Sequence, residues 1–398
     1  MRRLLWVGDA GCDSGFARCT HKVLDTLRHE WDVTVLALNY RGDPHKYPYP
    51  MYPALKYMGD PFGVKRILEV CTAVAPDMVV IQNDPWNIPA YVAALEPMKT
   101  KPVLVGAIAI DGKNCQGERY LNGLDHAIFW TEFAQREAVE GGFTKPSHVV
   151  PMGVDRSIYS PGDRDAARKQ LGWADMKNPK TGKSVPDDAF VFLNVNRNQP
   201  RKRMDLTYQY FADFVHNHGA DNAYLYMHVA PTGDSGYDLR QLTRYYGLQG
   251  RVILVDQGIW NGASEQELVD TYRAADVLIS TTQGEGWGLT TLEAMACGLP
   301  CIVPDWSALG DWARNAARLV PCSATALTPN NTNVVGGIPD RREFVWAMNV
   351  LYGNKRSRDQ KTLDSLSLAK QPQFDWANVG RAFGDALNAA YNETLLGV

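Results

Sequence analysis

Two carboxylates lie among three glycines in one short stretch, residues 284–293, with the sequence GEGWGLTTLE. From Leu289 the apolar spacing becomes helical, so the glycines come directly before a helix. Amide N–H groups at a helix start lie at the positive end of the helix dipole and bind anions readily. Glu285 precedes this helix, and Glu293 lies about one turn inside it. An anion site between two hydrogen-bond acceptors suits a ligand with phosphates and hydroxyls, such as a nucleotide sugar.

The same stretch has a simpler explanation. Acidic residues near helix starts commonly offset the dipole, and Gly-rich turns connect strands to helices in many α/β proteins. A candidate buried strand, residues 277–279, comes before the stretch, and Gly298 and Pro300 end the helix before a second strand, residues 301–303. The loop of this strand–loop–helix–strand unit lies where parallel sheets bind ligands.

Residues 285–300, EGWGLTTLEAMACGLP, resemble the E-x7-E signature of retaining glycosyltransferases of the GT-B fold, family-4 (group 1) type. The resemblance implies that Glu285 contacts hydroxyls of a donor sugar and that Glu293 holds the ribose. It also implies that the family's nucleobase loop corresponds to Gly258 and Ile259. The amides between the two carboxylates would meet the sugar and diphosphate. They belong to Gly286, Trp287, Gly288, Leu289 and Thr290.

Four basic residues follow another candidate strand, residues 190–195, within the stretch NRNQPRKR. Alone, this pattern is typical of a solvated face or of a patch that faces nucleic acid. The resembled family has an arginine after this strand and a lysine five residues on, which Arg197 and Lys202 match. The resemblance therefore implies fixed cations beside a departing nucleoside diphosphate, where they would stabilise the transition state. Arg201 and Arg203 are expected to face solvent.

A glycine-containing loop also follows the first candidate strand, residues 4–7. Its sequence, GDAGCDSGFAR, does not match GxGxxG, which weakens any assignment as a dinucleotide oxidoreductase. Ser14 fits as the N-cap of the helix that follows. The resembled family places a comparable loop against the donor phosphates, which implies that role for Gly11, Ser14 and Gly15. A capped turn without ligand contact is the alternative.

Polar residues at other strand ends are candidates for binding an acceptor. Asn83, Asp84 and Trp86 follow the candidate strand 78–82, at the edge where parallel sheets bind ligands. A further strand ends before Asp111, at or just before which many members of the resembled family carry a His. Asp111 either takes over a polar contact to the substrates or forms an ordinary Asp-Gly turn.

Strands alternate with helices in two successive sets, which predicts two Rossmann-like domains with parallel sheets. Together with the resemblance, the expected fold is α/β, of the GT-B type, with the sheets facing a central cleft. Residues 1–155 are expected to form an acceptor domain, residues 156–188 a linker and residues 189–375 a donor domain. GT-B relatives send their last helix back to the first domain, so residues 376–398 are expected to pack there.

Two segments lack any helix or strand period. Residues 39–61 are rich in Tyr and Pro, and they either shape an acceptor pocket or cover the edge of a sheet. Residues 322–337 are polar and contain glycine, and they are expected to form a loop.

The composition, 45% hydrophobic and 21% charged, is that of a globular protein, and 398 residues suffice for two or three domains. A net charge of −3 gives no overall basic character for binding nucleic acid or an anionic membrane. Seven scattered cysteines without a CxxC pair favour a reducing compartment over a disulfide or zinc framework. No stretch fits a signal peptide or a membrane span, so the cytoplasm is the expected location.

These patterns, with the resemblance, predict a retaining glycosyltransferase that moves a sugar from a UDP- or GDP-linked donor to a hydroxyl of a glycan or small molecule. The resembled family is described as using front-face attack, in which the leaving phosphate helps to deprotonate the acceptor. No protein nucleophile and no cofactor are then required. The donor half has no DxD pair at a strand end, so metal independence is predicted. Three alternatives stay open: transfer to modified bases of DNA by a viral type of enzyme, a nucleotide-sugar epimerase of the same fold, and a non-catalytic nucleotide-sugar-binding module.

Overall fold

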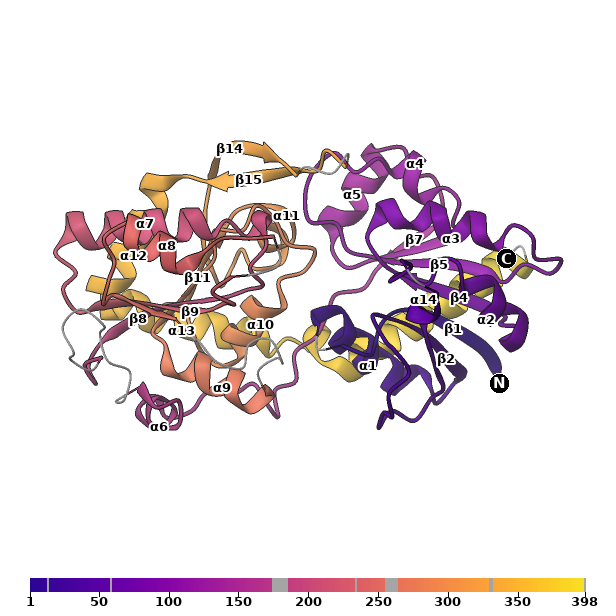
Figure 1. The fold of residues 1–398 in the computed structure, drawn as a ribbon, viewed down its shortest axis with the longest axis horizontal. Coiled ribbons are helices and arrows are strands. Elements are labelled where there is room, and N and C mark those ends of the chain that lie inside the picture. The colour runs from indigo at the N-terminus through magenta and orange to yellow at the C-terminus, as the bar shows by residue number, and fades with distance from the viewer. Residues whose placement is uncertain are drawn as a thin grey trace. The chain divides into compact units, whose positions relative to one another are not determined.

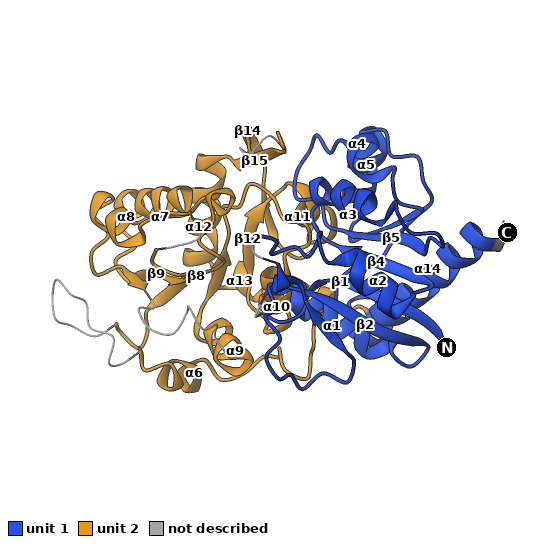
Figure 2. Cartoon of the chain, turned by 45° about the vertical axis from the view of Figure 1, so that its right-hand side comes forward, with its two compact units in different colours: residues 1–153, 372–398 blue, residues 154–371 orange. Residues whose placement is uncertain are grey.

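A computed structural model describes residues 1–12, 14–57, 59–173, 185–232, 235–254, 264–328 and 332–396. The chain divides into two compact units (Figure 2). Unit 1 contains Met1–Gly153 and Pro372–Val398, and unit 2 contains Val154–Gln371. Each unit has its own sheet and its own buried core, and each is described by itself.

Unit 1 is built on one parallel sheet (Figure 1). Its described strands follow the order β3-β2-β1-β4-β5-β6-β7. The strands are β1 (Arg2–Asp9), β2 (Trp31–Leu38), β3 (Met51–Pro53), β4 (Met78–Gln82), β5 (Val103–Ile108), β6 (His126–Phe129) and β7 (Ser147–Val149). The helices are α1 (Gly15–Leu27), α2 (Ile67–Val74), α3 (Ile88–Leu95), α4 (Gly117–Leu121), α5 (Glu132–Glu140) and α14 (Trp376–Leu396), with 3-10 turns at η1 (Ala54–Lys56), η2 (Pro85–Asn87) and η6 (Pro372–Phe374).

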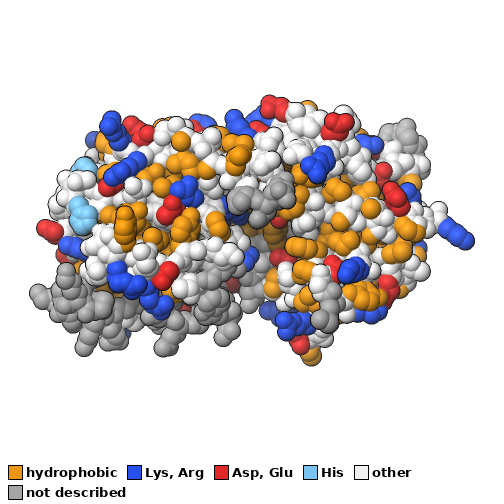
Figure 3. Space-filling model, turned by 45° about the horizontal axis from the view of Figure 1, so that its top comes forward, with side chains coloured by type: hydrophobic (Ala, Val, Ile, Leu, Met, Phe, Trp, Pro, Cys, Tyr) orange, Lys and Arg blue, Asp and Glu red, His pale blue; other side chains and the backbone are white. Residues whose placement is uncertain are grey.

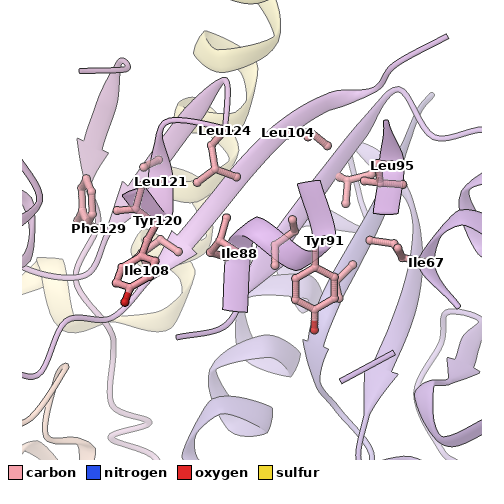
Figure 4. Close-up of a cluster of buried hydrophobic side chains, with 14 of the residues drawn as sticks. Ile67, Ile88, Tyr91, Leu95, Leu104, Ile108, Tyr120, Leu121, Leu124 and Phe129 are labelled. Atoms are coloured by element: carbon pink, nitrogen blue, oxygen red, sulfur yellow. The ribbon is translucent and has the colours of Figure 1, made fainter. Parts of the chain in front are cut away.

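The central strands of unit 1 are apolar runs because helices cover both of their faces. Leu4 to Val7 of β1 are fully buried. Figure 4 shows Ile88, Tyr91 and Leu95 of α3 in the cluster on one side. On the other side, α14 packs against α1 so closely that a Cβ on Gly380 would lie 2.3 Å from Thr26. The C-terminal helix is therefore part of the core of unit 1.

Unit 2 repeats this architecture. Its described strands form a parallel sheet in the order β10-β9-β8-β11-β12-β13, beside a separate β14-β15 hairpin. The strands are β8 (Phe190–Val195), β9 (Ala223–His228), β10 (Val252–Leu254), β11 (Val277–Ile279), β12 (Cys301–Pro304), β13 (Arg318–Val320), β14 (Cys322–Leu327) and β15 (Val335–Pro339). The helices are α6 (Arg164–Gln170), α7 (Met204–His218), α8 (Leu239–Tyr245), α9 (Glu265–Ala274), α10 (Leu289–Ala296), α11 (Ser307–Trp312), α12 (Arg341–Gly353) and α13 (Lys355–Ala369), with a 3-10 turn at η4 (Pro200–Lys202).

Each sheet has one position where the direction of winding reverses. In unit 2 the chain runs outward from β8 to β9 and β10, and then returns to add β11 on the other side of β8. In unit 1 it runs from β1 to β2 and β3 and returns to β4 beside β1. The loops at such a reversal diverge to opposite faces and leave a crevice at the carboxyl ends of the two strands. Each unit therefore has one favoured place for a ligand.

The expectation of a loop at residues 322–337 is wrong, because the antiparallel hairpin β14–β15 occupies this segment. Side chains of β14 are largely exposed, so the strand lacks the apolar alternation that identifies a half-buried strand. Gly336 of β15 lies against the loop after β11, where a Cβ would come 2.5 Å from the Cβ of Gln283. Glycine at this position of β15 thus allows the strand to lie close to the loop after β11.

Two further observations concern the whole described chain. All seven cysteines are described, and none takes part in a disulfide. Among the described residues, none of the helices combines the length and the apolar character needed to span a bilayer.

Candidate functional site

The two motif loops of unit 2 meet because their strands are neighbours. β8 and β11 pair in parallel, with Leu193 opposite Leu278. The basic stretch leaves the end of β8, and the glycine stretch leaves the end of β11. A backbone hydrogen bond from Gln283 N to Arg201 O, 2.8 Å long, joins the two loops. The motifs, more than 80 residues apart in sequence, are therefore built into one crevice at the reversal of the sheet.

Lys202 and Glu285 form an ion pair at this position. The ammonium group of Lys202 donates a hydrogen bond to Glu285 Oε1, and their side chains are only 10% and 12% exposed. Arg201 Nη1 lies 3.6 Å from Glu285 Oε2 and donates to Gly284 O at 2.8 Å. Burial alone would raise the pKa of Glu285, but the charges of Lys202 and Arg201 outweigh it and the pKa lies below its ordinary value. Glu285 is therefore an ionised acceptor held by two cations.

The backbone around Glu285 is held by the start of α11. Ser307 Oγ accepts a hydrogen bond from Glu285 N at 2.9 Å, and Ala308 N donates to Glu285 O at 3.3 Å. Trp312, at the end of α11, donates its indole N–H to Trp287 O at 2.7 Å and stacks on the Trp287 ring. These contacts fix the loop from the side of α11, and a fixed loop can present its groups to a ligand without reorganising.

Gly288 ends the loop and begins α10. Its φ of +92° lies in the left-handed region, and a Cβ there would come 2.7 Å from Leu309. From here α10 is buried on nearly every side, with Thr290 half-buried in its first turn. Glu293 lies in α10, and its Oε2 accepts a hydrogen bond from the Tyr272 hydroxyl at 2.8 Å. The helix start and both carboxylates thus belong to one connected structure.

The structure separates the basic residues that the sequence placed together. Lys202 is buried on Glu285, whereas Arg197 is exposed. Arg201 was expected to face solvent, and this expectation is wrong because its guanidinium turns toward Gly284 and Glu285. Arg203 pairs with Asp205 at the start of α7. The other predicted donor residues, Gly258 and Ile259, lie outside the described residues.

In unit 1 the candidate loop after β1 makes mainly local contacts. Ser14 Oγ accepts from Ala17 N at 3.0 Å as the N-cap of α1, which begins at Gly15, and donates to Asp9 Oδ2 at 2.8 Å. Gly11 lies where a Cβ would come 2.5 Å from the Tyr40 ring. Its role at the donor phosphates, like those of Ser14 and Gly15, stays a prediction.

A hollow of about 620 Å³ lies beside this loop, between residues 10–12 and the segment after β2. The hollow is lined by the exposed cations Arg41 and Lys46, by Asp43 and by aromatic rings of the same segment. One wall is preformed, because Tyr47 stacks on His21 of α1 with the ring centres 3.4 Å apart. This volume lies within the usual range for small-molecule pockets. The Tyr- and Pro-rich segment thus lines this hollow, and its role in an acceptor pocket stays a prediction.

The residues predicted on the acceptor side follow the strands as expected. The described contacts of Asn83 and Trp86 are made within unit 1. Asn83 is buried, donates to the hydroxyl of Tyr91 at 3.1 Å and accepts from Asn87 at 2.9 Å. Trp86 packs its ring against the core of unit 1. Asp84 and Asp111 are half-buried just beyond the ends of β4 and β5. Acceptor roles for these residues stay predictions.

Several residues at the site were not found from sequence. Ser307, Trp312 and Tyr272 reach the motif from other elements, and no local pattern marks them. These residues could be found only from their positions in neighbouring helices: Ser307 and Trp312 lie in α11, which follows α10, and Tyr272 lies in α9, which precedes it. Among the described residues, no group of three or more His, Cys, Asp or Glu side chains has the arrangement of a metal site.

Comparisons with known proteins bear on the family and the fold. Residues 176–331 match the family model described as glycosyl transferases group 1. D-inositol 3-phosphate glycosyltransferase of Geodermatophilus obscurus is 31% identical over 232 residues, which cover 56% of this chain and 48% of that protein. The chain thus spans about half the length of this curated relative.

Solved structures match over nearly the whole chain. Sucrose-phosphate synthase from Thermosynechococcus elongatus aligns with a TM-score of 0.74 at 15% identity, covering 98% of this chain and 99% of that one. HepE from Anabaena, solved with UDP-glucose, aligns with a TM-score of 0.72 at 16% identity, covering 98% of this chain and 100% of that one. At these identities the likeness shows the fold.

The chain therefore has the GT-B fold of two Rossmann-like domains, as predicted. Residues 176–331, which contain both carboxylates, match the group 1 glycosyl transferases, in agreement with the predicted family.

Proposed function

We propose that this protein is a retaining glycosyltransferase that takes a sugar from a UDP- or GDP-linked donor and transfers it to an acceptor hydroxyl. The observation that carries the proposal is the placement of Lys202 on Glu285 at the reversal of the sheet in unit 2. It brings a cation and a hydroxyl acceptor to the start of α10, where a diphosphate and a sugar would lie together. UDP-glucose in the solved Anabaena relative supports a nucleotide sugar as the ligand class.

The chemistry follows from where negative charge grows. As the bond between sugar and diphosphate breaks, charge accumulates on the departing phosphate oxygens. Lys202, Arg197 and the backbone amides of residues 286–289 would stabilise that charge, and a preorganised set of donors lowers the barrier most effectively. Glu285, ionised and fixed, would accept hydrogen bonds from sugar hydroxyls and hold the anomeric carbon in place.

Lys202 can serve both partners. An ammonium group has three N–H donors, and one of them is directed at Glu285 in the hydrogen bond described above. We propose that a donor diphosphate binds the same ammonium group that holds Glu285. The ion pair then links the sugar end of the donor to its phosphate end, which positions both for the same reaction step.

Unit 1 would supply the acceptor side, with Asp111 as the group that orients the attacking hydroxyl and with Asn83, Asp84 and Trp86 nearby. The hollow beside Gly11 offers an aromatic wall and two cations, a combination that suits a hydroxylated ring with an anionic group. The name of the Geodermatophilus relative includes an inositol phosphate. We therefore favour a phosphorylated sugar or polyol within the predicted class of glycan or small-molecule acceptors.

Retention would follow from attack on the face that the phosphate leaves, with a phosphate oxygen accepting the proton of the acceptor hydroxyl. This step needs no protein nucleophile. The cations at the diphosphate supply the positive charge that a bound metal ion contributes elsewhere, so we propose that turnover does not depend on a divalent metal. Dialysis against a chelator should leave the rate unchanged.

The alternative functions receive less support. On the face that Figure 3 shows, Lys and Arg side chains are interspersed with Asp and Glu, without a broad basic patch among the described residues. A DNA acceptor is not supported by the relatives. An epimerase would release an altered free sugar without an acceptor, and a binding module would release none.

A panel of nucleotide sugars tests the proposal. UDP- and GDP-linked hexoses are added to the protein, and thermal stabilisation and slow hydrolysis of each donor are measured. One donor should raise the unfolding temperature and be cleaved to a sugar of unchanged anomeric configuration. Absence of stabilisation across the panel would contradict the proposal, and release of an epimerised sugar would identify the alternative.

A further inference from the structure

Glu293 accepts a hydrogen bond from a residue of α9, a helix that contributes no motif residue. Tyr272 of α9 donates its phenolic O–H to Glu293 Oε2 at 2.8 Å, across 21 positions of sequence. Both residues are buried, Tyr272 to 1% exposure and Glu293 to 4%. A Glu side chain on a helix has several rotamers, and a buried hydrogen bond to one oxygen selects among them.

Tyr272 is itself locked in place by the segment that enters unit 2. Its ring packs beside that of Tyr159, with the ring centres 6.2 Å apart. The neighbouring Arg273 donates from Nε to Ser160 O at 2.8 Å and from Nη2 to Ser160 Oγ at 3.0 Å. Gly162 allows this approach, because a Cβ there would lie 2.6 Å from the Arg273 side chain. The phenol therefore has a fixed position from which to orient Glu293.

We propose that Tyr272 is a positioning residue for ribose recognition: it orients the Glu293 carboxylate toward the two ribose hydroxyls of the donor. This inference rests on the proposed function, in which Glu293 binds the ribose. A carboxyl group has two oxygens, and the phenol donates to one of them, which fixes the angle at which the group meets a ligand. Two neighbouring hydroxyls donate in a set geometry, and their binding depends on the angle of the carboxylate.

A purely structural role for the phenol predicts a different outcome. If the hydrogen bond only satisfies buried polar atoms, its loss lowers the stability of unit 2 and affects all nucleotides alike. If it orients Glu293, its loss affects ligands that have the ribose hydroxyls and spares those that lack them. The two roles are therefore separated by comparing ligands as well as variants.

The experiment measures calorimetric binding of UDP and GDP, and of their 2′,3′-dideoxy forms, to the full chain. The wild type should prefer one ribonucleotide over its dideoxy form. In Tyr272→Phe that preference should fall roughly fivefold to tenfold, as expected for one lost hydrogen bond, while the dideoxy form binds within about twofold of wild type. With that nucleotide's sugar conjugate as donor, KM should rise by a similar factor, and kcat should stay within about threefold.

A matched control is Tyr208→Phe. Tyr208 is fully buried in α7 of the same unit, and its hydroxyl pairs with Thr243 of α8. This variant should lose stability without any change in the preference for the ribonucleotide.

The outcomes separate the inference from the proposed function. An unchanged preference in Tyr272→Phe, or an equal loss for both forms, would overturn the positioning role and leave donor binding intact. A wild type that binds the two forms equally would also overturn it. A wild type that binds neither UDP nor GDP would contradict the proposed function first, and the inference would fall with it.

Discussion

The two units share one topology but use the crevice at the sheet reversal differently. In unit 2, residues from α9, α11 and two loops converge on Glu285 and Glu293, with cations against the first and a phenol against the second. In unit 1, the polar side chains at the equivalent position are engaged locally: Ser14 caps α1, and Asn83 bonds to Tyr91 and Asn87. The same fold thus holds a preorganised site in one unit and mostly architectural contacts in the other.

The difference indicates what each unit can recognise. A crevice with fixed charges suits a ligand part that is constant, such as a nucleoside diphosphate. Unit 1 instead has a hollow lined by exposed side chains of an irregular segment, which can vary without disturbing the sheet. We expect donor binding to depend on unit 2 and acceptor choice to depend on the segment after β2.

The largest effect is expected from Glu285→Gln. The amide keeps the shape of the side chain but leaves Lys202 buried without an ionised partner, which is costly. We expect kcat/KM to fall by roughly 100-fold, because the lost group is a preorganised charge at the reacting sugar. Steady-state kinetics and thermal unfolding measure both effects. Glu265→Gln, at an exposed position in α9, is the control, and a Glu285→Gln enzyme with near wild-type kcat/KM would remove Glu285 from the mechanism.

Lys202→Ala should reduce turnover more than tenfold, because one charge-assisted contact is worth about 1.5–3 kcal/mol. Arg203→Ala, which removes a neighbouring cation paired with Asp205, should change turnover much less. Rates for the two variants at saturating donor make the comparison. Equal losses would mean that general basic charge, and not the placement of Lys202, matters.

Arg41→Ala and Lys46→Ala test whether unit 1 binds the acceptor. Each should raise KM for a phosphorylated acceptor by roughly tenfold and leave the KM of the donor unchanged, because the charge-assisted contact is to the acceptor alone. Lys65→Ala, outside the hollow, serves as the control. A higher donor KM in the Arg41 or Lys46 variant would contradict the division of labour between the units.

Ser14→Ala is expected to act through stability. Loss of an N-cap costs about 1 kcal/mol, and donor affinity should stay within about twofold of wild type. Thr131→Ala is the matched variant, since Thr131 caps α5 in the same way with its hydroxyl accepting from Ala134 N. If Ser14→Ala weakens UDP or GDP binding while Thr131→Ala does not, Ser14 has the direct phosphate contact that its family resemblance implies.

Acid should act on His126 and on Glu285 in different pH windows. His126 of β6 is buried beside His148. Burial is the larger cause and the neighbouring imidazole the smaller one, and together they lower the pKa of His126 to about 4 despite the opposing charge of Glu393. Because the folded pKa lies below the unfolded value of 6.5, the neutral form stabilises the fold above pH 6.5 and this contribution is lost as pH falls toward 4. Glu285, with a pKa below 4.5, loses its contribution only at lower pH. Thermal unfolding between pH 8 and 3 should show a shallower dependence of stability on pH above pH 4.5 in His126→Gln, and the remaining slope should come from His228, whose pKa burial also lowers to about 4.

Local patterns in the sequence predicted the elements around the site well. The strands Val277–Ile279 and Phe190–Val195 and the helix that begins at Leu289 agree with the structure, because apolar runs bounded by Gly and Pro are local signals. The adjacency of the two loops follows from topology, which the sequence implies only through the family resemblance. The hairpin at 322–339 was missed because exposed strand residues and closely packed glycines leave no period.

Contacts between residues on different helices and loops could not be predicted from the sequence. Arg201 looked like a solvated charge next to Lys202, yet it turns inward because the Gly284 carbonyl and the Glu285 carboxylate lie on the neighbouring loop. Tyr272 and Ser307 look like ordinary helix residues, and only the fold brings them to the carboxylates. Residue types and spacing identified candidate ligand-binding groups, whereas the groups that hold them in place required the structure.

A crystal structure of the protein soaked with UDP and, separately, with GDP tests the central claim most directly. The account predicts that one nucleotide places its diphosphate against the amides of residues 286–289, with the Lys202 ammonium within hydrogen-bond distance of a phosphate oxygen and the ribose on Glu293. A nucleotide bound elsewhere, or a diphosphate at this position that Lys202 does not contact, would contradict it.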